Sequence, residues 1–227
     1  EELKNHLINT VKINLEEEKI ENAYIRLVVS RGEGDLGLDP RKCKEPSVII
    51  IVDKIQLYPK EFYEKGLRLI ISSYRRPSAD ILSPRIKSLN YLNNILAKIE
   101  ANNANAQEAI MLNQQGYITE CTADNIFIVK DEVVKTPPPF VGILEGITRQ
   151  SVLEMCKELG IKSEEVIIDV KDLLTADEVF ITGTGAEIVP IRQINNLEFH
   201  IGKITKKLIE YFPKFVQKHS TKVFVNV

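Results

Sequence analysis

The segment Ser83–Leu96, SPRIKSLNYLNNIL, places a single lysine, Lys87, where an irregular stretch turns into a predicted helix. We expect the helix to run from Ser88 to about Asn102, because apolar residues recur there at helical spacing. These residues predict one buried stripe: Leu89, Leu92, Ile95, Leu96 and Ile99. A lysine at the mouth of an apolar helix can act as a nucleophile or base. The alternative is an ordinary surface lysine, since lysines are rarely buried.

Composition places the chain among ordinary soluble globular proteins. It has 227 residues, of which 44% are hydrophobic and 27% are charged. The net charge of -2, without a concentrated basic patch, indicates no nucleic-acid partner. No apolar run approaches the roughly 20 residues of a membrane span, and no signal-peptide pattern opens the chain. We therefore expect neither nucleic acid nor a membrane as partner.

The cysteines and histidines suggest no metal site. Cys43, Cys121 and Cys156 are isolated and odd in number, and the three histidines do not cluster. Such spacing predicts neither a zinc site nor a disulfide framework. It fits a reducing, cytoplasmic location best.

The first part of the chain reads as a small domain, residues 1–74. An amphipathic helix with apolar residues Leu3, Leu7, Ile8, Val11 and Leu15 precedes three predicted strands. These are Ala23–Ser30, Ser47–Asp53 and Gly66–Tyr74, the second being apolar enough for a central strand. On the first strand, Tyr24 and Arg26 share a face and can hold a small carboxylate. A solvated arginine on an edge strand is the alternative.

Residues 75–81, stiffened by Pro77, read as a linker to a large domain at 82–227. Glu108–Asn113 and Tyr117–Thr122 form a predicted hairpin, and Ile126–Lys130 and Val133–Thr136 continue the meander. Glu120 lies inside one of these strands. An unpaired buried carboxylate is costly, so Glu120 requires a cationic partner unless it faces water.

Two glycine-containing turns are candidates for binding an anion. Gly146 precedes a predicted helix that has a threonine, Thr148, in its first turn. The second turn, Ile181–Glu187 (ITGTGAE), surrounds Thr184 with glycines. Free backbone N–H groups at such places can receive a phosphate, although lone glycine-rich loops are weak signals.

These parts together match the chemical needs of pyridoxal 5'-phosphate. The cofactor has an aldehyde for a lysine, a pyridine nitrogen for a carboxylate, and a phosphate for N–H groups. The chain offers Lys87, Glu120 and the two anion-receptive turns for these three roles.

Five segments resemble fold-type IV pyridoxal-phosphate enzymes, and specifically branched-chain amino-acid aminotransferases. They occur in the family's order and spacing between about Ala23 and Ile191: AYIRLVVSRGEGDLGLDP, IKSLNYLNN, GYITECTADNIFIV, GILEGITRQ and ADEVFITGTGAEIVPI. The resemblance implies a mixed α/β fold with two domains, a small α/β domain and a larger domain with a barrel-like sheet flanked by helices. It also implies transamination of leucine, isoleucine and valine with 2-oxoglutarate.

The resemblance assigns roles to matching residues. Lys87 corresponds to the lysine that binds the cofactor covalently, Glu120 to the partner of the pyridine nitrogen, and Tyr91 to the partner of the phenolic oxygen. Leu144 corresponds to the leucine packed on the ring. The remaining assignments are phosphate binding by Gly146, Ile147, Thr148 and Thr184, and binding of the substrate carboxylate by Tyr24, Arg26, Thr184 and Gly185.

The resemblance also bears on assembly and on the start of the chain. The family forms at least a homodimer, and the loop Gly32–Asp39, with its apolar Leu36 and Leu38, matches the segment that lies over a neighbour's pocket. Fifty to sixty residues of the family, including small-domain strands and a phosphate-binding arginine, precede the part that matches Glu1. We expect the molecule in solution to carry such residues; a truncated chain would retain cofactor weakly.

Other functions fit the same residues. A D-amino-acid aminotransferase or an aminodeoxychorismate lyase would share Lys87 and Glu120. A cofactor-free module that binds another anion, or an inactive fragment, belongs to a different class. The colour of the purified protein and its bleaching by borohydride separate the enzyme from the module.

Overall fold

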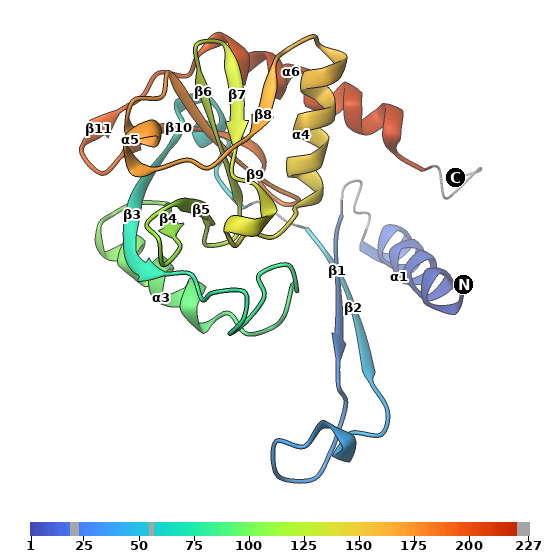
Figure 1. The fold of residues 1–227 in the computed structure, drawn as a ribbon. Helices are drawn as coiled ribbons and strands as arrows, with labels where there is room; N and C mark the ends of the chain where they lie inside the picture. The colour runs from blue at the N-terminus through green and yellow to red at the C-terminus, as the bar shows by residue number, and fades with distance from the viewer. Residues whose placement is uncertain (19–22, 55–56, 222–227) are drawn as a thin grey trace. The chain divides into compact units, whose positions relative to one another are not determined.

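The computed structural model describes residues 1–18, 23–54 and 57–221 of the chain (Figure 1). Contacts group them into two compact units, one comprising Glu1–Gln56 and Thr221–Val227, the other Leu57–Ser220. The division therefore lies before the linker expected at 75–81, because the strand Leu67–Arg75 belongs to the sheet of the second unit.

The first unit contains one helix and a two-stranded sheet. Helix α1 spans Glu2–Glu18, strand β1 spans Tyr24–Ser30, and strand β2 spans Ser47–Asp53, with a short 3-10 turn, η1, at Pro40–Lys42. The strands pair antiparallel along their full length, and α1 packs on β2. Leu3 is exposed and Leu7, Ile8 and Val11 are half-buried, while the side chain of Leu15 lies outside the described residues.

The prediction that Ser47–Asp53 is a central strand is wrong for the described residues. Its only strand partner among them is β1, and Val48, Ile49 and Ile51 are exposed. A continuous apolar run is typical of a strand that is buried on both faces. Here the run lies in a sheet of two strands, which leaves several of its apolar side chains exposed.

The second unit contains a large mixed sheet and its helices. Its elements are α2 (Lys60–Lys65), β3 (Leu67–Arg75), α3 (Leu92–Asn103), β4 (Glu108–Leu112), β5 (Ile118–Cys121), β6 (Asn125–Lys130), β7 (Val133–Thr136), η2 (Pro139–Val141), α4 (Ile147–Glu158), β8 (Ser163–Glu165), α5 (Val170–Leu174), β9 (Glu178–Gly183), β10 (Glu187–Ile194), β11 (Leu197–Glu198) and α6 (Lys203–His219). The hairpin expected from the sequence is confirmed as β4 and β5, and β6 and β7 also pair as neighbours. The two pairs do not form one continuous meander, because among the described strands β6 pairs with β7 and β9 and not with β5.

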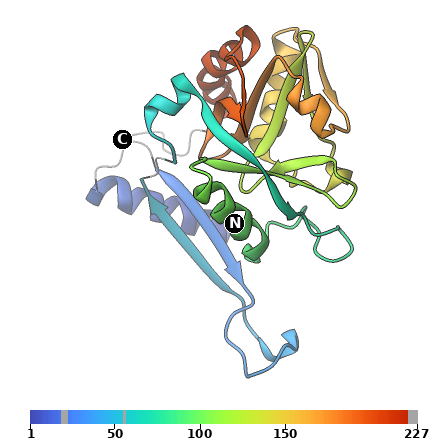
Figure 2. The same ribbon diagram turned by 90° about the vertical axis from the view of Figure 1, so that its left-hand side faces the viewer.

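The sheet curls back on itself. Among the described residues its order is β5-β4-β3-β10-β9-β6-β7-β8, with β11 beside β10. Strand β3 runs parallel to both β4 and β10, and thereby joins the hairpin to the rest of the sheet. Strands β5 and β6 are far apart in this order, yet they contact each other directly. The result is the half-barrel visible from two sides in Figures 1 and 2.

Helices α4 and α6 cover one face of the sheet around β6 and β9 (Figure 1). The rings of Phe127 and Phe180 stack beneath them, with centroids 4.9 Å apart. Leu208 and Phe215 of α6 are buried in this core. Val152 of α4 is also buried.

Helix α3 corrects the prediction made from its leucines and isoleucines. It begins at Leu92 instead of Ser88. The expected stripe faces outward: Leu89, Leu92, Ile95 and Ile99 are exposed, and Leu96 is only half-buried. The buried face instead carries Ala97 and Ala101, which pack against Ala109 and Met111 of β4. Small side chains allow the helix to approach the sheet closely, a criterion that apolar spacing does not reveal.

A buried glutamate on the sheet caps α6. Glu178, at the start of β9, accepts hydrogen bonds from the backbone N–H groups of Ile204 at 3.2 Å and Thr205 at 2.7 Å. These are donors of the first helical turn, which lack intrahelical partners. A methyl group added at Gly202 would overlap the Glu178 carboxylate, so the helix requires glycine there.

We expect Glu178→Ala to lower the free energy of unfolding by about 1–3 kcal/mol, since it leaves buried N–H groups without acceptors. Urea unfolding followed by circular dichroism measures the change. The exposed Glu198 provides a control, and Glu198→Ala should stay within about 0.5 kcal/mol of the wild type. Equal stabilities of the two variants would show that the cap contributes nothing.

Candidate active site

A cavity of about 490 Å³ opens in the second unit. Its walls include the irregular segment before α3, the turn between β5 and β6, and the loop before α4. Four residues predicted from the sequence line it together: Lys87, Tyr91, Glu120 and Leu144. They come from three separate segments, so tertiary folding creates this arrangement.

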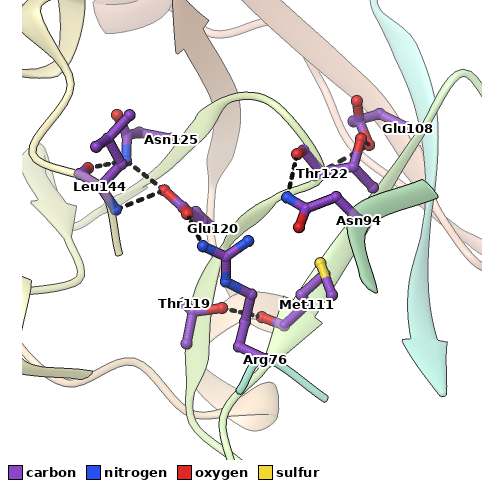
Figure 3. A network of polar contacts seen from close by, with 9 residues as sticks. All are labelled: Arg76, Asn94, Glu108, Met111, Thr119, Glu120, Thr122, Asn125 and Leu144. Carbon is purple, nitrogen blue, oxygen red and sulfur yellow. Dashed lines mark hydrogen bonds and ion pairs between the residues drawn. The ribbon is translucent and has the colours of Figure 1, made fainter. Parts of the chain in front are cut away.

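Glu120 anchors one wall through both carboxylate oxygens (Figure 3). Arg76 Nη2 donates to Glu120 Oε1 at 2.5 Å, and both side chains are buried. Asn125 Nδ2 donates to Oε2 at 3.1 Å, and the backbone N–H of Leu144 donates to the same oxygen at 3.0 Å. Asn125 also donates to the carbonyl oxygen of Leu144 at 2.9 Å. The cationic partner expected for Glu120 is therefore Arg76.

The electrostatics of Glu120 reflect a competition between burial and its donors. Burial raises the pKa of the Glu120 carboxyl to about 7. Arg76 and the N–H group of Leu144 oppose this rise in pKa, and Lys87 and Arg149 oppose it more weakly. A cation delivered into the cavity would favour the ionised carboxylate further.

A second buried carboxylate, Glu108, binds Thr122, another residue of the cavity wall (Figure 3). Its Oε1 accepts from the hydroxyl of Thr122 at 2.6 Å and from the backbone N–H of Thr122 at 3.2 Å. Its Oε2 lies 3.6 Å from the ammonium nitrogen of Lys98 on α3. Asn94 of α3 donates to the carbonyl oxygen of Thr122 at 2.6 Å. These bonds fasten α3 to the β5–β6 turn.

Lys87 lies in an irregular segment that precedes α3, and its side chain is exposed. Local backbone bonds shape this segment, among them Ser88 N–H to the carbonyl oxygen of Ile86 at 2.8 Å. Arg85 forms an ion pair at 3.0 Å with Glu145, which joins this segment to the loop before α4. The lysine is thus held near the cavity by a turn and not by a helix.

The start of α4 has the features expected of an anion-binding turn. Gly146 precedes the helix and provides no capping side chain. A methyl group at Gly146 would overlap the side-chain oxygen of Asn125, which explains the glycine. Thr148 is buried in the first turn, while Ile147 is exposed. The first N–H groups of this twelve-residue helix are therefore available to an anion.

The remaining predicted residues lie outside the cavity wall. Thr184 and Gly185 form the turn between β9 and β10, and Thr184 is exposed. Tyr24 and Arg26 lie on β1 in the first unit, opposite Asp53 and Ile51. Their binding of a substrate carboxylate stays a prediction.

Sequence reasoning did not single out Arg76, Asn125 and Asp124, which are among the residues that line the cavity. Arg76 stood in a charged segment interpreted as a linker, with no local signal that it pairs with a glutamate 44 positions away. Asn125 and Asp124 follow Glu120 closely, and two polar residues directly before an apolar strand could have drawn attention.

Two searches of the described residues bear on other classes of function. No group of three or more histidine, cysteine or acidic side chains among them is placed to hold a metal ion. Every helix within the described ranges is too short or too polar to cross a membrane.

Comparison with known proteins extends this picture. Residues 1–194 match the family amino-transferase class IV. The chain is 49% identical to a putative branched-chain-amino-acid aminotransferase of Methanocaldococcus jannaschii, over 99% of this chain and 76% of that protein. It covers less of other relatives, for example 63% of the branched-chain-amino-acid aminotransferase of Escherichia coli K12, at 36% identity.

Solved structures agree with the sequence comparison. The crystal structure of the Escherichia coli branched-chain amino acid aminotransferase matches 99% of this chain and 74% of its own, with a TM-score of 0.90 and 31% identity. A T.th. branched-chain amino acid aminotransferase with pyridoxamine 5'-phosphate matches 96% of this chain and 71% of its own, with a TM-score of 0.87 and 33% identity. The T.th. enzyme has also been solved with N-(5'-phosphopyridoxyl)-L-glutamate and with 4-methylvaleric acid.

These matches cover most of this chain, and the curved sheet with its separate two-stranded sheet is the fold of those enzymes. The chain therefore belongs to amino-transferase class IV, the pyridoxal-phosphate family that includes the branched-chain amino-acid aminotransferases.

Proposed function

We propose that this protein transfers the amino group of leucine, isoleucine or valine to 2-oxoglutarate with pyridoxal 5'-phosphate as cofactor. The observation that carries the proposal is the cavity in which Lys87, Tyr91, Glu120 and Leu144 meet. The names of the relatives support the choice of branched-chain substrates. The ligands of the T.th. enzyme, an aminated cofactor, a glutamate adduct and a branched acid, fit the two halves of such a reaction.

The residues present fit the cofactor. Glu120 supplies a carboxylate for the pyridine nitrogen, and its other contacts keep it in place in the wall. The uncapped start of α4, Gly146 to Thr148, suits a phosphate. Tyr91 would donate to the phenolic oxygen, Leu144 would pack on the ring, and Thr184 would add a hydroxyl near the phosphate.

Bound pyridoxal phosphate supplies an electron sink that stabilises negative charge at the α-carbon of the substrate. In the proposed mechanism, the amine of Lys87 moves a proton from that carbon as a general base. Glu120 stays ionised beside the positively charged pyridine nitrogen and so favours the protonated ring. Tyr24, Arg26 and the backbone N–H groups of Thr184 and Gly185 would receive the substrate carboxylate.

We expect Lys87→Ala to abolish transamination while the fold stays intact, because no hydrogen bond or ion pair of the described structure uses this side chain. An assay with L-leucine and 2-oxoglutarate measures the loss, and Lys157→Ala, an exposed lysine on α4, is the matched control. Borohydride reduction of the coloured wild type should fix the cofactor on Lys87, as read by peptide mass spectrometry. Full activity of the Lys87 variant would refute the assignment.

The same assay separates related activities. Turnover of D-alanine in place of L-leucine would identify a D-amino-acid aminotransferase, and release of pyruvate from aminodeoxychorismate would identify the lyase. A colourless protein that takes up no pyridoxal phosphate would support a cofactor-free module or an inactive fragment instead.

We expect Glu120→Gln to retain cofactor but to lower kcat by about a hundredfold or more, the range of a lost acid–base or charge partner. A neutral amide keeps the size of the side chain, yet it cannot hold the pyridine nitrogen in its charged form. Stopped-flow spectroscopy of a single half reaction measures the loss. The control is Glu108→Gln, which removes a buried carboxylate that does not line the cavity. If the kcat of Glu120→Gln stays within a few-fold of that of Glu108→Gln, Glu120 has only a structural role.

The proposed molecule is at least a homodimer. Leu36 and Leu38 are 89% and 102% exposed at the tip of the β1–β2 hairpin, as expected of apolar residues that meet a partner. We expect sedimentation to show a dimer, and Leu36→Ser with Leu38→Ser to impair substrate binding more than cofactor binding. An active monomer would contradict this assembly.

Because all three cysteines are free thiols, we place the protein in the cytoplasm.

A further inference from the structure

Asp124 is a buried carboxylate in the cavity wall that the proposed mechanism does not use. It lies in the β5–β6 turn and is 6% exposed. Its carboxylate lies against the backbone of Gly183, where any added methyl group would overlap it. Within the described ranges, no donor forms a hydrogen bond with this carboxylate. A carboxylate buried in this way is costly unless a cation or a proton joins it.

Its surroundings make an isolated negative charge unfavourable. Burial raises the pKa of the Asp124 carboxyl to about 7, and the nearby carboxylates Glu108 and Glu120 contribute to the rise. Lys98 and Lys87 lower this pKa. Tyr58, Tyr63 and the buried thiol of Cys121 also face this charge, and Asp124 raises the pKa of each.

The other charged groups nearby already have partners. Glu120 binds Arg76, and Glu108 binds Lys98, whose ammonium also donates to the carbonyl oxygen of Gln107. Of the cationic side chains lining the described cavity, Lys87 is the one with neither an ion pair nor a hydrogen bond. Asp124 is the corresponding carboxylate without a partner. The described cavity thus contains one unpaired anion and one unpaired cation.

We propose that Asp124 is the counter-ion of Lys87: its carboxylate receives the Lys87 ammonium whenever that amine carries no other group. The pair neutralises both charges within the cavity and turns the exposed lysine inward. Asp124 is then a positioning residue, which acts on the reaction through Lys87. That catalytic consequence rests on the proposed function, whereas the ion pair itself does not.

The ion pair between Asp124 and Lys87 predicts how fast the Lys87 amine reacts with an acylating reagent when no cofactor is bound. An ammonium held by a carboxylate reacts slowly with acylating reagents, since only the neutral amine is nucleophilic. We expect Asp124→Asn to speed acetylation of Lys87 by trace acetic anhydride at pH 8 by about tenfold, the size of effect that one opposite charge within about 4–6 Å has on protonation. Peptide mass spectrometry reads Lys87 against exposed Lys157 in the same sample. Hydroxylamine followed by dialysis removes any bound pyridoxal phosphate beforehand.

Asp131→Asn is the matched control, because it makes the same substitution at an exposed aspartate in the turn between β6 and β7, away from the cavity lining. It should leave Lys87 within about twofold of the wild type. An unchanged Lys87 rate in Asp124→Asn, or an equal rise in the control, would overturn the proposal. Circular dichroism checks folding, and Asp124→Ser replaces the asparagine variant if that variant does not fold.

The experiment also separates this proposal from the proposed function. A protein that lacks transaminase activity, but whose Lys87 reactivity depends on Asp124, would refute the function and keep the ion pair. An active enzyme with no such dependence would keep the function and refute the pair.

Discussion

The buried ion pair between Glu120 and Arg76 is the constraint on which the cavity depends. Arg76 follows β3, Glu120 lies in β5, and the second oxygen of Glu120 binds Asn125 of β6 and the loop residue Leu144. One carboxylate therefore joins four segments of the chain. Removing one partner of such a pair leaves a buried charge and typically costs about 3–5 kcal/mol. The position of Leu144, and through it the start of α4, depends on this carboxylate.

The polar interior of this region is expensive for a protein and useful for an enzyme. Glu108, Glu120 and Asp124 lie close together, and burial raises the pKa of Glu120 and Asp124 to about 7. A domain built for stability alone would place apolar side chains there. Perturbed carboxylates that line a cavity are typical of sites that receive a charged ligand. Two glycines make room for these polar side chains: Gly146 leaves space for Asn125, and Gly183 leaves space for Asp124.

The helix after the lysine shows where pattern and packing diverge. Leucines and isoleucines at helical spacing predicted a buried stripe, but α3 packs through Ala97 and Ala101 and leaves Leu92 and Ile95 exposed. Periodicity predicts correctly that this segment is a helix. It does not show which face packs on the sheet when one face carries leucines and isoleucines and another carries alanines. The closer approach available to alanine decides which face meets the sheet. The apolar run of β2 is a similar case. Its composition is typical of a central strand, but among the described residues β2 pairs with β1 alone.

Local sequence patterns were enough to predict most of the helices and strands and the residues with chemical roles. The spacing of apolar residues predicted the β4–β5 hairpin and a helix after Lys87, because both depend on local spacing. Five motifs singled out Lys87 and Glu120 as candidate site residues. Three outcomes became visible in the folded structure alone. Arg76 pairs with Glu120, β3 joins the large sheet, and Asp124 has no partner among the described residues. These outcomes depend on burial and on contacts between distant segments, and neither is encoded in local spacing.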